Sequence, residues 1–486
     1  MVGWPQTALN AAGISISLQF TRAWPTNKAV MSPFKSRSDK DRKPRPGKPA
    51  RGGFSHGRVD GGQGGGRLQQ VEIIELGPKG DGIARAGRDR IYIDRGLPGD
   101  VLKVRARRGE DGHIRGDIVD MLTPSQHRAQ APCPHYDQCG GCTLQHASDD
   151  FYRHWIDRTV RIALDKQGVR VREFLPTVFI AAGTRRRATF AAVKGGNNVM
   201  MGYYRRRSHD IHEVDTCLVS DPGIMGLREI MKPYLLKVLK GGKATDIFVQ
   251  KIGAQFDVLI TGNIGSDAEP DLACRQVLAQ MVNETSVARI SWRGRERDRI
   301  ETIVARAPLI SSFGNLNVAM PPAAFMQPTP EGQAALVSAV MAALPAKGKF
   351  ADLFCGCGTF TGPMLERGPV DAYESVDTAI GALNKAKGSL PLKTFIRDLF
   401  RNPLKRDEAN RYDAIVFDPP RAGAEDQCRA IAASRCRLLI GVSCNPATFA
   451  RDARILTEGG YRLQSVQIVD QFTWSHHVEV IGVFHK

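Results

Sequence analysis

Four short, mostly apolar runs in the C-terminal third of the chain constrain its fold more than any other feature. They lie at residues 350–354, 370–374, 412–417 and 438–442, with stretches of helical character between them. Continuous apolar runs are typical of strands buried on both faces, as in a parallel sheet covered by helices. From Gly348 onward we therefore expect a Rossmann-like α/β domain, whose ligands bind at the carboxyl edge of the sheet.

A cysteine stands at this edge, directly after the last apolar run. Asn445 and Pro446 follow Cys444 and end the strand, and a helix is expected from about Ala447. A thiol in such a loop can act as a nucleophile, because its thiolate forms more readily than an alkoxide. The alternative is a small core residue, the usual role of a free cysteine.

A glycine turn follows the first of the four runs. Gly356 and Gly358 let the backbone approach a ligand, and the next strand ends in Glu374, whose carboxylate could accept hydrogen bonds from ribose hydroxyls. A dinucleotide site would have its third glycine at position 361, but Gly362 comes one position late. S-adenosylmethionine (SAM) therefore fits this turn better than NAD.

The chain of 486 residues has a formal net charge of +18, which points to a polyanionic partner, most simply nucleic acid. A basic tail on a neutral enzyme is the alternative. Residues 28–67 carry 11 Lys and Arg and 3 Asp and Glu, a net charge of +8 (11 − 3), so the rest of the chain is basic too. We expect residues 1–67 to be a disordered basic tail and Met31 to be the genuine start.

The length of the chain predicts two to four domains. No apolar run of about 18 residues that would indicate a membrane span occurs, and residues 1–30 lack the pattern of a signal peptide. Ten cysteines without a regular framework fit a reduced protein with metal-binding or catalytic thiols. We expect a cytoplasmic monomer.

Short alternating strands separated by glycine turns predict a small β-barrel over residues 68–125. Its strands carry cations that suit phosphate contacts, namely Lys103, Arg105, Arg107 and Arg108. The phrases GPKGDGIAR and GLPGDV resemble a TRAM domain, a small RNA-binding barrel.

A Cys-x5-Cys-x2-Cys cluster follows the expected barrel, made of Cys133, Cys139 and Cys142, with Cys217 as a fourth candidate ligand. Four thiolates can hold zinc or an iron–sulfur cluster, and the spacing does not decide between them. The pair Gly140-Gly141 would let the backbone approach a bulky inorganic core.

The segment from there to about residue 320 has a mixed α+β pattern. Two strand-like stretches at 184–190 and 201–207 place arginines beside aromatic residues, which suits RNA through phosphate pairing and base stacking. A solvated charged strand face is the alternative for each stretch.

Four phrases carry a resemblance to a known family: DLFCGCGTF, FDPPRAG, SCNPATFARD and the terminal HHVE. They resemble the bacterial RNA 5-methyluridine methyltransferases. With the TRAM-like barrel and the phrase CPHYDQCGGCTLQH, the chain resembles the branch that acts on 23S ribosomal RNA, over about residues 69–486. The domains expected are the tail at 1–67, the barrel at 68–125, a central RNA-binding domain at 126–320 and a methyltransferase domain at 321–486.

The resemblance implies SAM-dependent methylation of carbon 5 of a uridine, with Cys444 as the nucleophile. It also implies a 4Fe-4S cluster on the four cysteines named above. The implied SAM and target pocket is lined by Gln327, Phe354, Thr359, Glu374, Asp398 and Asp418.

Carbon 5 of uracil is a poor nucleophile, so the chemistry needs a thiolate that adds at carbon 6 and makes an enolate. The hydrogen on carbon 5 must then leave to a base, for which Glu479 fits, although a surface strand residue is the alternative there. Asp418 and Arg421 could orient the base and stabilise the enolate charge. The target must be unpaired or flipped.

The chain departs from the family pattern at three places. Thr329 and Thr359 stand where the family often has Asn, and the loop before Glu479 lacks a proline and has Ser475 in place of Thr.

Several other readings remain open. Cys355 and Cys357 are rival nucleophiles, although they sit in the cofactor turn. A cytosine-5 methyltransferase, an RNA-binding assembly factor and a transfer-RNA enzyme are the other functions to separate by experiment.

Overall fold

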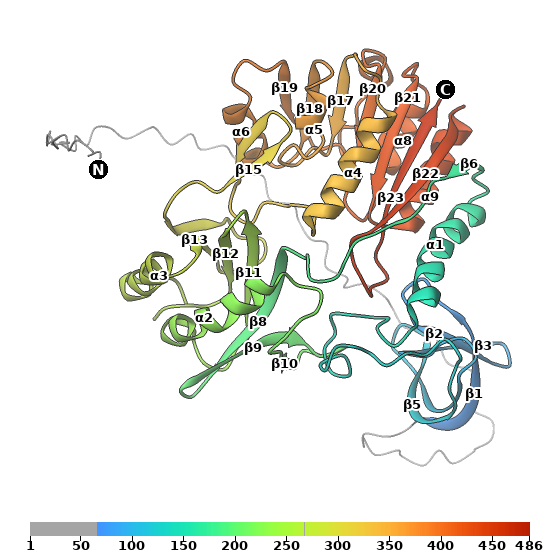
Figure 1. Ribbon diagram of the computed structural model, residues 1–486, viewed down its shortest axis with the longest axis vertical. Helices are drawn as coiled ribbons and strands as arrows, with labels where there is room; N and C mark the ends of the chain where they lie inside the picture. Colours follow the sequence, from blue (N-terminus) through green and yellow to red (C-terminus); the bar gives the residue numbers. More distant parts are fainter. Residues whose placement is uncertain (1–65, 267) are drawn as a thin grey trace, which may run out of the picture. The chain divides into compact units, whose positions relative to one another are not determined.

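The computed structural model describes residues 66–266 and 268–486 (Figure 1). The expected disordered tail therefore lies outside the described residues except for Gly66 and Arg67, and so does the expected start at Met31. No helix in the described ranges is long and apolar enough to cross a membrane.

The predicted small barrel is confirmed. It is closed, with the strand order β1-β2-β3-β5-β4, and its strands are β1 (Arg67–Leu76), β2 (Gly82–Ala86), β3 (Asp89–Ile93), β4 (Val101–Arg108) and β5 (Ile114–Thr123). Because side chains alternate along a strand, Leu102 and Val104 of β4 are buried while Lys103 and Arg105 are exposed.

The central part of the chain forms a seven-stranded sheet in the order β10-β9-β8-β11-β12-β13-β14. Its strands are β8 (Arg187–Gly195), β9 (Asn198–Tyr204), β10 (Ile211–Glu213), β11 (Thr245–Ile252), β12 (Gln255–Thr261), β13 (Val287–Arg293) and β14 (Glu301–Ala305). Apolar side chains of α2 (Pro222–Val238) and α3 (Leu272–Glu284) share one core with these strands. A hairpin of β15 (Ile310–Phe313) and β16 (Leu316–Ala319) follows.

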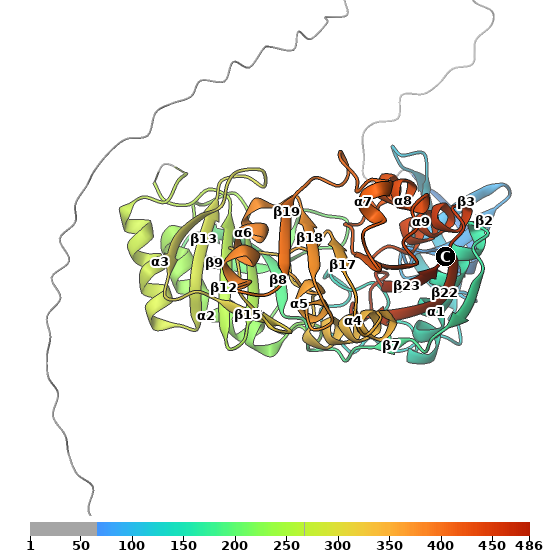
Figure 2. The ribbon, with the colours of Figure 1, turned by 90° about the horizontal axis from the view of Figure 1, so that it is seen from above.

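The expected α/β domain is built on a nine-stranded sheet in the order β19-β18-β17-β20-β21-β23-β22-β6, with β7 paired to β22. Figure 2 shows β17, β18 and β19 side by side. The strands are β6 (Val171–Phe174), β7 (Val178–Phe179), β17 (Phe350–Leu353), β18 (Val370–Glu374), β19 (Leu392–Ile396), β20 (Ala414–Phe417), β21 (Leu438–Ser443), β22 (Arg462–Asp470) and β23 (Glu479–His485). β17 to β21 are parallel, and β23 runs antiparallel to both of its neighbours.

Two separate cores lie against this sheet, as expected for a sheet covered on both faces. One core includes residues of α1 (Asp149–Lys166), α8 (Glu425–Ala432) and α9 (Pro446–Glu458). The other includes residues of α4 (Pro330–Ala343), α5 (Thr361–Met364) and α6 (Asp377–Ala386), together with the β15–β16 hairpin. A one-turn helix, α7 (Arg406–Ala409), precedes β20.

The sheet also contains a segment from before the expected methyltransferase domain. α1 packs against α9, while β6 and β7 pair with β22. Residues 149–179, which the sequence-based boundaries assign to the central domain, therefore complete the C-terminal sheet.

Candidate active site and cysteine cavity

Three loops meet around Cys444, which lies between β21 and α9. Asn445 caps α9 by accepting a hydrogen bond from the Ala447 backbone N–H at 3.1 Å. Its side-chain amide donates to the backbone carbonyl of Arg421 at 3.1 Å. Arg421 Nη2 in turn lies 3.2 Å from His477 Nε2. The loops after β20 and β21 and before β23 are thus tied together at the thiol.

Cys444 opens into a cavity of about 510 Å³. One wall comes from the barrel turn, another from α1 and a third from the loops around the thiol. The lining combines cations with apolar side chains, and it includes Lys79, Ile162, Lys166, Arg421, Pro446 and His476. This mixture suits a polyanion with flat bases, because cations can pair with phosphates and apolar atoms with base faces.

The Cys444 thiol is protonated at neutral pH. Burial, together with the nearby carboxyls of Glu479 and Asp418, raises its pKa to about 11, and Arg421 acts in the opposite direction. The thiol must therefore lose its proton as it attacks a ligand. Arg187 of β8 is a second cation, and it interacts electrostatically with both Cys444 and Glu479.

Two amides and two carboxyls form a connected network beside the thiol. Gln327 Nε2 donates to Asp418 Oδ2 at 3.4 Å. Gln471 Nε2 donates to Gln327 Oε1 at 2.8 Å and to Glu479 Oε1 at 3.2 Å. Glu479 is buried at the start of β23, so the predicted base is not a surface residue.

Asp418 and Glu479 act as a coupled acid pair. Burial raises the pKa of both carboxyls, and the charge of Asp418 further raises that of Glu479. Asp418 is half-buried and Glu479 is buried. Two carboxyls that repel each other lose their protons in separate steps, and the two pKa values describe the pair. The pair can therefore accept a proton near neutral pH, which an ordinary carboxyl cannot.

The glycine turn after β17 faces the acid at the end of β18. The Gly356 N–H donates to Glu374 Oε2 at 3.1 Å, while Glu374 Oε1 accepts from the N–H of Val376 at 3.0 Å. A side chain at Gly358, where φ is +98°, would place its Cβ 2.8 Å from Leu383. Glycine is therefore required for this close approach.

The other predicted pocket residues lie along the same edge of the sheet. Phe354 follows β17 in a left-handed conformation (φ 62°), and its ring lies 5.5 Å from that of Phe400. Asp398 lies just beyond β19 and accepts from the Phe400 N–H at 3.0 Å. Thr359 lies in the glycine turn and is half-buried. These residues and Glu374 follow the carboxyl ends of neighbouring parallel strands, which is the edge where ligands of such sheets bind.

Sequence reasoning missed Asp352 as a site residue. It is fully buried in β17, and burial raises its pKa to about 7. Its Oδ2 accepts from the Thr361 hydroxyl at 2.5 Å, while its buried Oδ1 has no hydrogen-bond partner in the described part of the chain. An acid at the end of the strand before a glycine turn was the available signal.

The rival nucleophiles Cys355 and Cys357 are buried in the core on the α4 side of the sheet. Burial raises the pKa of Cys355 far above its usual range and that of Cys357 to about 11. Both thiols therefore pack the turn, and neither lines the cavity that Cys444 opens into.

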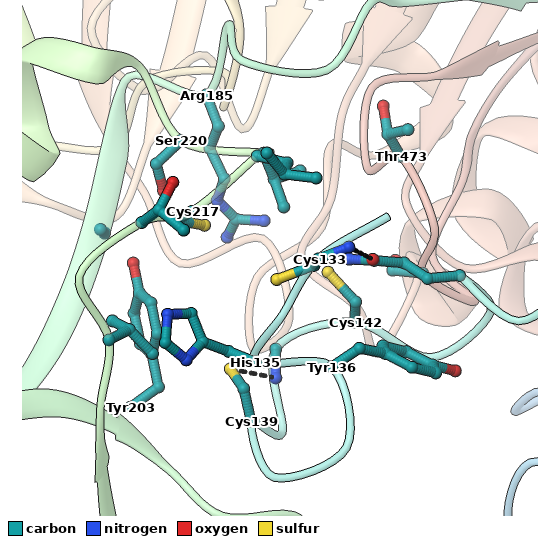
Figure 3. Close-up of a pocket in the computed structure, with 18 of the residues that line it drawn as sticks. Cys133, His135, Tyr136, Cys139, Cys142, Arg185, Tyr203, Cys217, Ser220 and Thr473 are labelled. Atoms are coloured by element: carbon teal, nitrogen blue, oxygen red, sulfur yellow. Dashed lines mark hydrogen bonds between the residues drawn. The ribbon is translucent and has the colours of Figure 1, made fainter. Parts of the chain in front are cut away.

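The four predicted metal ligands surround a second cavity, of about 300 Å³ (Figure 3). Cys133, Cys139, Cys142 and Cys217 all line it, although Cys217 comes from a distant part of the chain. Burial raises the pKa of the first three thiols, and the nearby thiols raise it further. Such thiols would bind a cation that replaces their protons.

The arrangement does not suit a single ion. Within residues 66–266 and 268–486, no group of three or more His, Cys, Asp or Glu side chains is placed to hold a metal ion. The four thiols line one cavity without forming such a group. The glycine pair has divided roles: Gly141 lines the cavity, whereas Gly140 packs against β9, with its N–H donating to the Tyr204 carbonyl at 3.0 Å.

The cysteine cavity shares a wall with the loop at residues 471–478, here called the catalytic loop. Phe472, Thr473 and Ser475 line the cavity. The backbone N–H groups of Thr143 and Leu144, next to Cys142, donate to the Trp474 carbonyl at 2.7 and 3.0 Å. The segment that contains Cys142 is thus hydrogen-bonded to the loop that leads to Glu479.

The two arginine-rich stretches do not form free RNA-binding faces. Arg186 donates to the Gln327 carbonyl at 2.9 Å and to Gln333 at 2.7 Å, which fixes the segment that carries Gln327. Arg206 pairs with Asp94 of the barrel at 2.9 Å, and Arg207 pairs with Asp81 at 2.5 Å. These arginines hold parts of the chain together, a role that composition could not reveal.

The chain matches two family models. Residues 396–486 match the model described as tRNA (Uracil-5-)-methyltransferase. Residues 316–435 match the model described as Methyltransferase small domain.

Known proteins resemble most of the described chain. An uncharacterized RNA methyltransferase of Caulobacter vibrioides is 37% identical over 431 residues, covering 86% of this chain and all of that protein. The 23S rRNA (uracil(1939)-C(5))-methyltransferase RlmD of Vibrio vulnificus is 27% identical over 435 residues, covering 86% of this chain and 96% of that protein. The fold resembles that of the Pyrococcus abyssi tRNA (uracil-54, C5)-methyltransferase, solved with S-adenosyl-L-homocysteine, with a TM-score of 0.65 and 21% identity over 85% of this chain and 99% of that one.

Proposed function

This chain belongs to the RNA methyltransferases of the uracil-5 family, and from that membership we propose that it methylates carbon 5 of a uridine in 23S ribosomal RNA through a covalent bond to Cys444. The observation that carries the proposal is the convergence of the Cys444 thiol with the coupled Asp418–Glu479 pair. Membership of the family supports SAM as the methyl donor, and the position of Phe354, Glu374 and Asp398 at the carboxyl edge of the sheet supports them as the residues that bind its adenosine group.

The residues divide the reaction between them. SAM supplies an electrophilic methyl group. Cys444 lines the open cavity, where it loses its proton to solvent and forms a bond to carbon 6, which makes carbon 5 nucleophilic. Arg187 and Arg421 supply positive charge near the developing enolate. After the methyl group has moved to carbon 5, Glu479 takes the hydrogen there as a proton, and the carbon–sulfur bond breaks to release Cys444.

A ribosomal substrate is supported by three features. The chain is similar to the Vibrio vulnificus 23S enzyme over nearly that protein's whole length. It also has a closed barrel with exposed cations, resembling the TRAM domain, and four cysteines around one cavity. A transfer RNA is the second candidate, because residues 396–486 match a model named for transfer-RNA enzymes.

The cysteine cavity is proposed to hold a 4Fe-4S cluster. A cavity of about 300 Å³ among four thiols is large for one zinc ion, whose four ligands close tightly around it. With all four irons bound by cysteine, the cluster would be structural. Protein purified without oxygen should be brown and contain iron and sulfide, and colourless protein with one zinc per chain would refute the assignment.

The function is tested by incubating the protein with labelled SAM and unmodified total RNA, then mapping the labelled nucleotides. We expect label in 23S ribosomal RNA at carbon 5 of one uridine. Label confined to transfer RNA would select the second candidate, and label on cytosine would refute uracil chemistry. SAM binding without any transfer would indicate an assembly factor.

A further inference from the structure

We propose that Gln471 is a positioning residue for proton removal from carbon 5, and that Thr329 sets the direction in which its amide points. The inference rests on the proposed role of Glu479 as the base. Gln471 follows β22 and is buried, with an exposed fraction of 3%. Neither Gln471 nor Thr329 is a predicted catalytic residue, and Thr329 stands where the family often has Asn.

The amide nitrogen of Gln471 serves two acceptors at once. Its two hydrogens can point to Gln327 Oε1 at 2.8 Å and to Glu479 Oε1 at 3.2 Å. An amide turned the other way would place its oxygen against two acceptor oxygens, which would repel it. The network therefore works in one orientation of the Gln471 side chain.

Thr329 supplies the group that selects this orientation. As the N-cap of α4, its hydroxyl oxygen accepts from the Gly332 N–H at 3.0 Å. A backbone N–H can only donate, so the hydroxyl hydrogen remains for Gln471 Oε1, which lies 3.4 Å away. The direction of donation thus runs from the start of α4 through Thr329 and Gln471 to Glu479.

Gly332 makes room for this contact. A side chain there would place its Cβ 2.3 Å from Gln471 Oε1 and 2.6 Å from Thr329 Oγ1. The first turn of α4 is therefore shaped around the amide.

The network decides how Glu479 can act. The charged or titratable groups that face its carboxyl are Asp418, Arg187, Arg421 and Cys444. Burial and Asp418 raise the pKa of Glu479, and the hydrogen bond from Gln471 opposes them by favouring the charged carboxylate. The amide hydrogen bond occupies Oε1 of Glu479, which leaves Oε2 as the oxygen to take the proton.

The test uses RNA with tritium at carbon 5 of uridine, in single turnovers at a series of pH values. Methyl transfer to the covalent complex and tritium release are measured separately. Gln471→Met removes the donor at similar size, so the pH midpoint of tritium release should rise by about one unit. At pH 7 the release should slow about tenfold, while methyl transfer to the complex stays within about twofold.

Thr329 provides the second pair of variants. Thr329→Val removes the hydroxyl without changing the shape, so the midpoint should shift in the same direction as in Gln471→Met. Thr329→Ser keeps the hydroxyl and should restore the wild-type midpoint. Gln427→Met is the matched control, because Gln427 of α8 is also buried but bonds to the backbone of Leu404.

The outcomes separate this inference from the proposed function. An unchanged midpoint in Gln471→Met that still binds SAM, or equal profiles for Thr329→Ser and Thr329→Val, would refute the positioning role. If Gln471→Met does not fold, the Thr329 pair alone decides. Absence of tritium release from the wild-type protein would instead refute the function of Glu479 as the base.

Discussion

At the scale of single residues, the proposed mechanism has Cys444 act before the methyl transfer and Glu479 after it. Glu479→Gln should still permit attack and methylation but should not remove the proton from carbon 5. The methylated base would then stay bound to Cys444, because elimination requires that proton to leave. We expect a protein–RNA adduct on a denaturing gel that carries the labelled methyl group.

The control is the double variant with Cys444→Ala, which should show no adduct and keep SAM binding. An adduct that survives loss of Cys444 would move the nucleophile to another cysteine. Normal turnover of Glu479→Gln would move the base elsewhere, with His477 the next residue to test.

The buried Asp352 predicts a pH dependence of stability. Its pKa is raised from 3.8 to about 7, so the folded state favours the protonated form. Its contribution is fully present below about pH 4 and is lost as the pH rises through 7. The Asp352→Asn side chain still accepts from the Thr361 hydroxyl but does not titrate. The difference in free energy of unfolding between this variant and the wild type should therefore shift in favour of the variant by on the order of 1–4 kcal/mol from pH 4 to pH 8.

Denaturant titrations of the two proteins at several pH values measure this difference. A constant offset across the range would show that Asp352 does not titrate there.

Residues at strand ends could be predicted from the sequence, and residues defined by long-range contacts could not. Cys444 and Glu374 follow apolar runs whose ends are visible in the sequence. Gln471 and Arg187 acquire their roles from partners on other elements, so no local pattern marks them. The same holds for Arg186, whose guanidinium binds the segment around Gln327 and is not free for RNA.

At the scale of elements, α1 holds the catalytic loop through one tyrosine. The Tyr152 hydroxyl donates to Asp470 Oδ2 at 2.7 Å and accepts from the Trp474 N–H at 3.0 Å. Tyr152→Phe leaves two buried polar groups without their partner, which should lower the free energy of unfolding by about 1–3 kcal/mol. Hydrogen exchange at residues 471–478 should become faster.

Tyr234→Phe is the matched control, since its hydroxyl bonds to Glu284 at 2.6 Å at an exposed site. Its effect should stay within about 0.5 kcal/mol. Equal effects of the two variants would show that burial does not determine the contribution of the contact.

Strands whose apolar residues follow a regular pattern along the sequence could be predicted. The four apolar runs are β17, β18, β20 and β21, and the alternating stretches form the barrel. A strand buried on both faces is apolar throughout, and a strand buried on one face alternates between apolar and polar residues, so both kinds can be recognised in the sequence. The helix expected after the glycine turn shrank to the four residues of α5, whose Gly362 lies too close to the Phe313 carbonyl for any side chain. That limit comes from the hairpin packed beside it.

At the scale of the whole molecule, the barrel should supply RNA affinity separately from the chemistry. Lys103→Gln with Arg105→Gln removes two exposed cations. If both contact phosphates of a single strand, the slope of log affinity against log salt should fall in magnitude by about 1.4, with SAM binding unchanged. Filter binding at several salt concentrations measures the slope.

The exposed pair Lys347→Gln with Lys385→Gln removes the same charge from the C-terminal domain. An equal change of slope in this control would show that net charge, and not the barrel surface, determines binding.

The pairing of β6 with β22 also sets the order in which the protein can be completed. Arg172 and Gln464 bond across these strands although they lie 292 positions apart. On the ribosome, α1 and β6 emerge roughly 15–60 s before the strand they await. The apolar face of α1, with Tyr152, Trp155 and Ile156, has no sheet to cover it in that interval. We therefore expect the nascent chain to bind chaperones during that interval, and a chain that ends before β22 and β23 to be degraded.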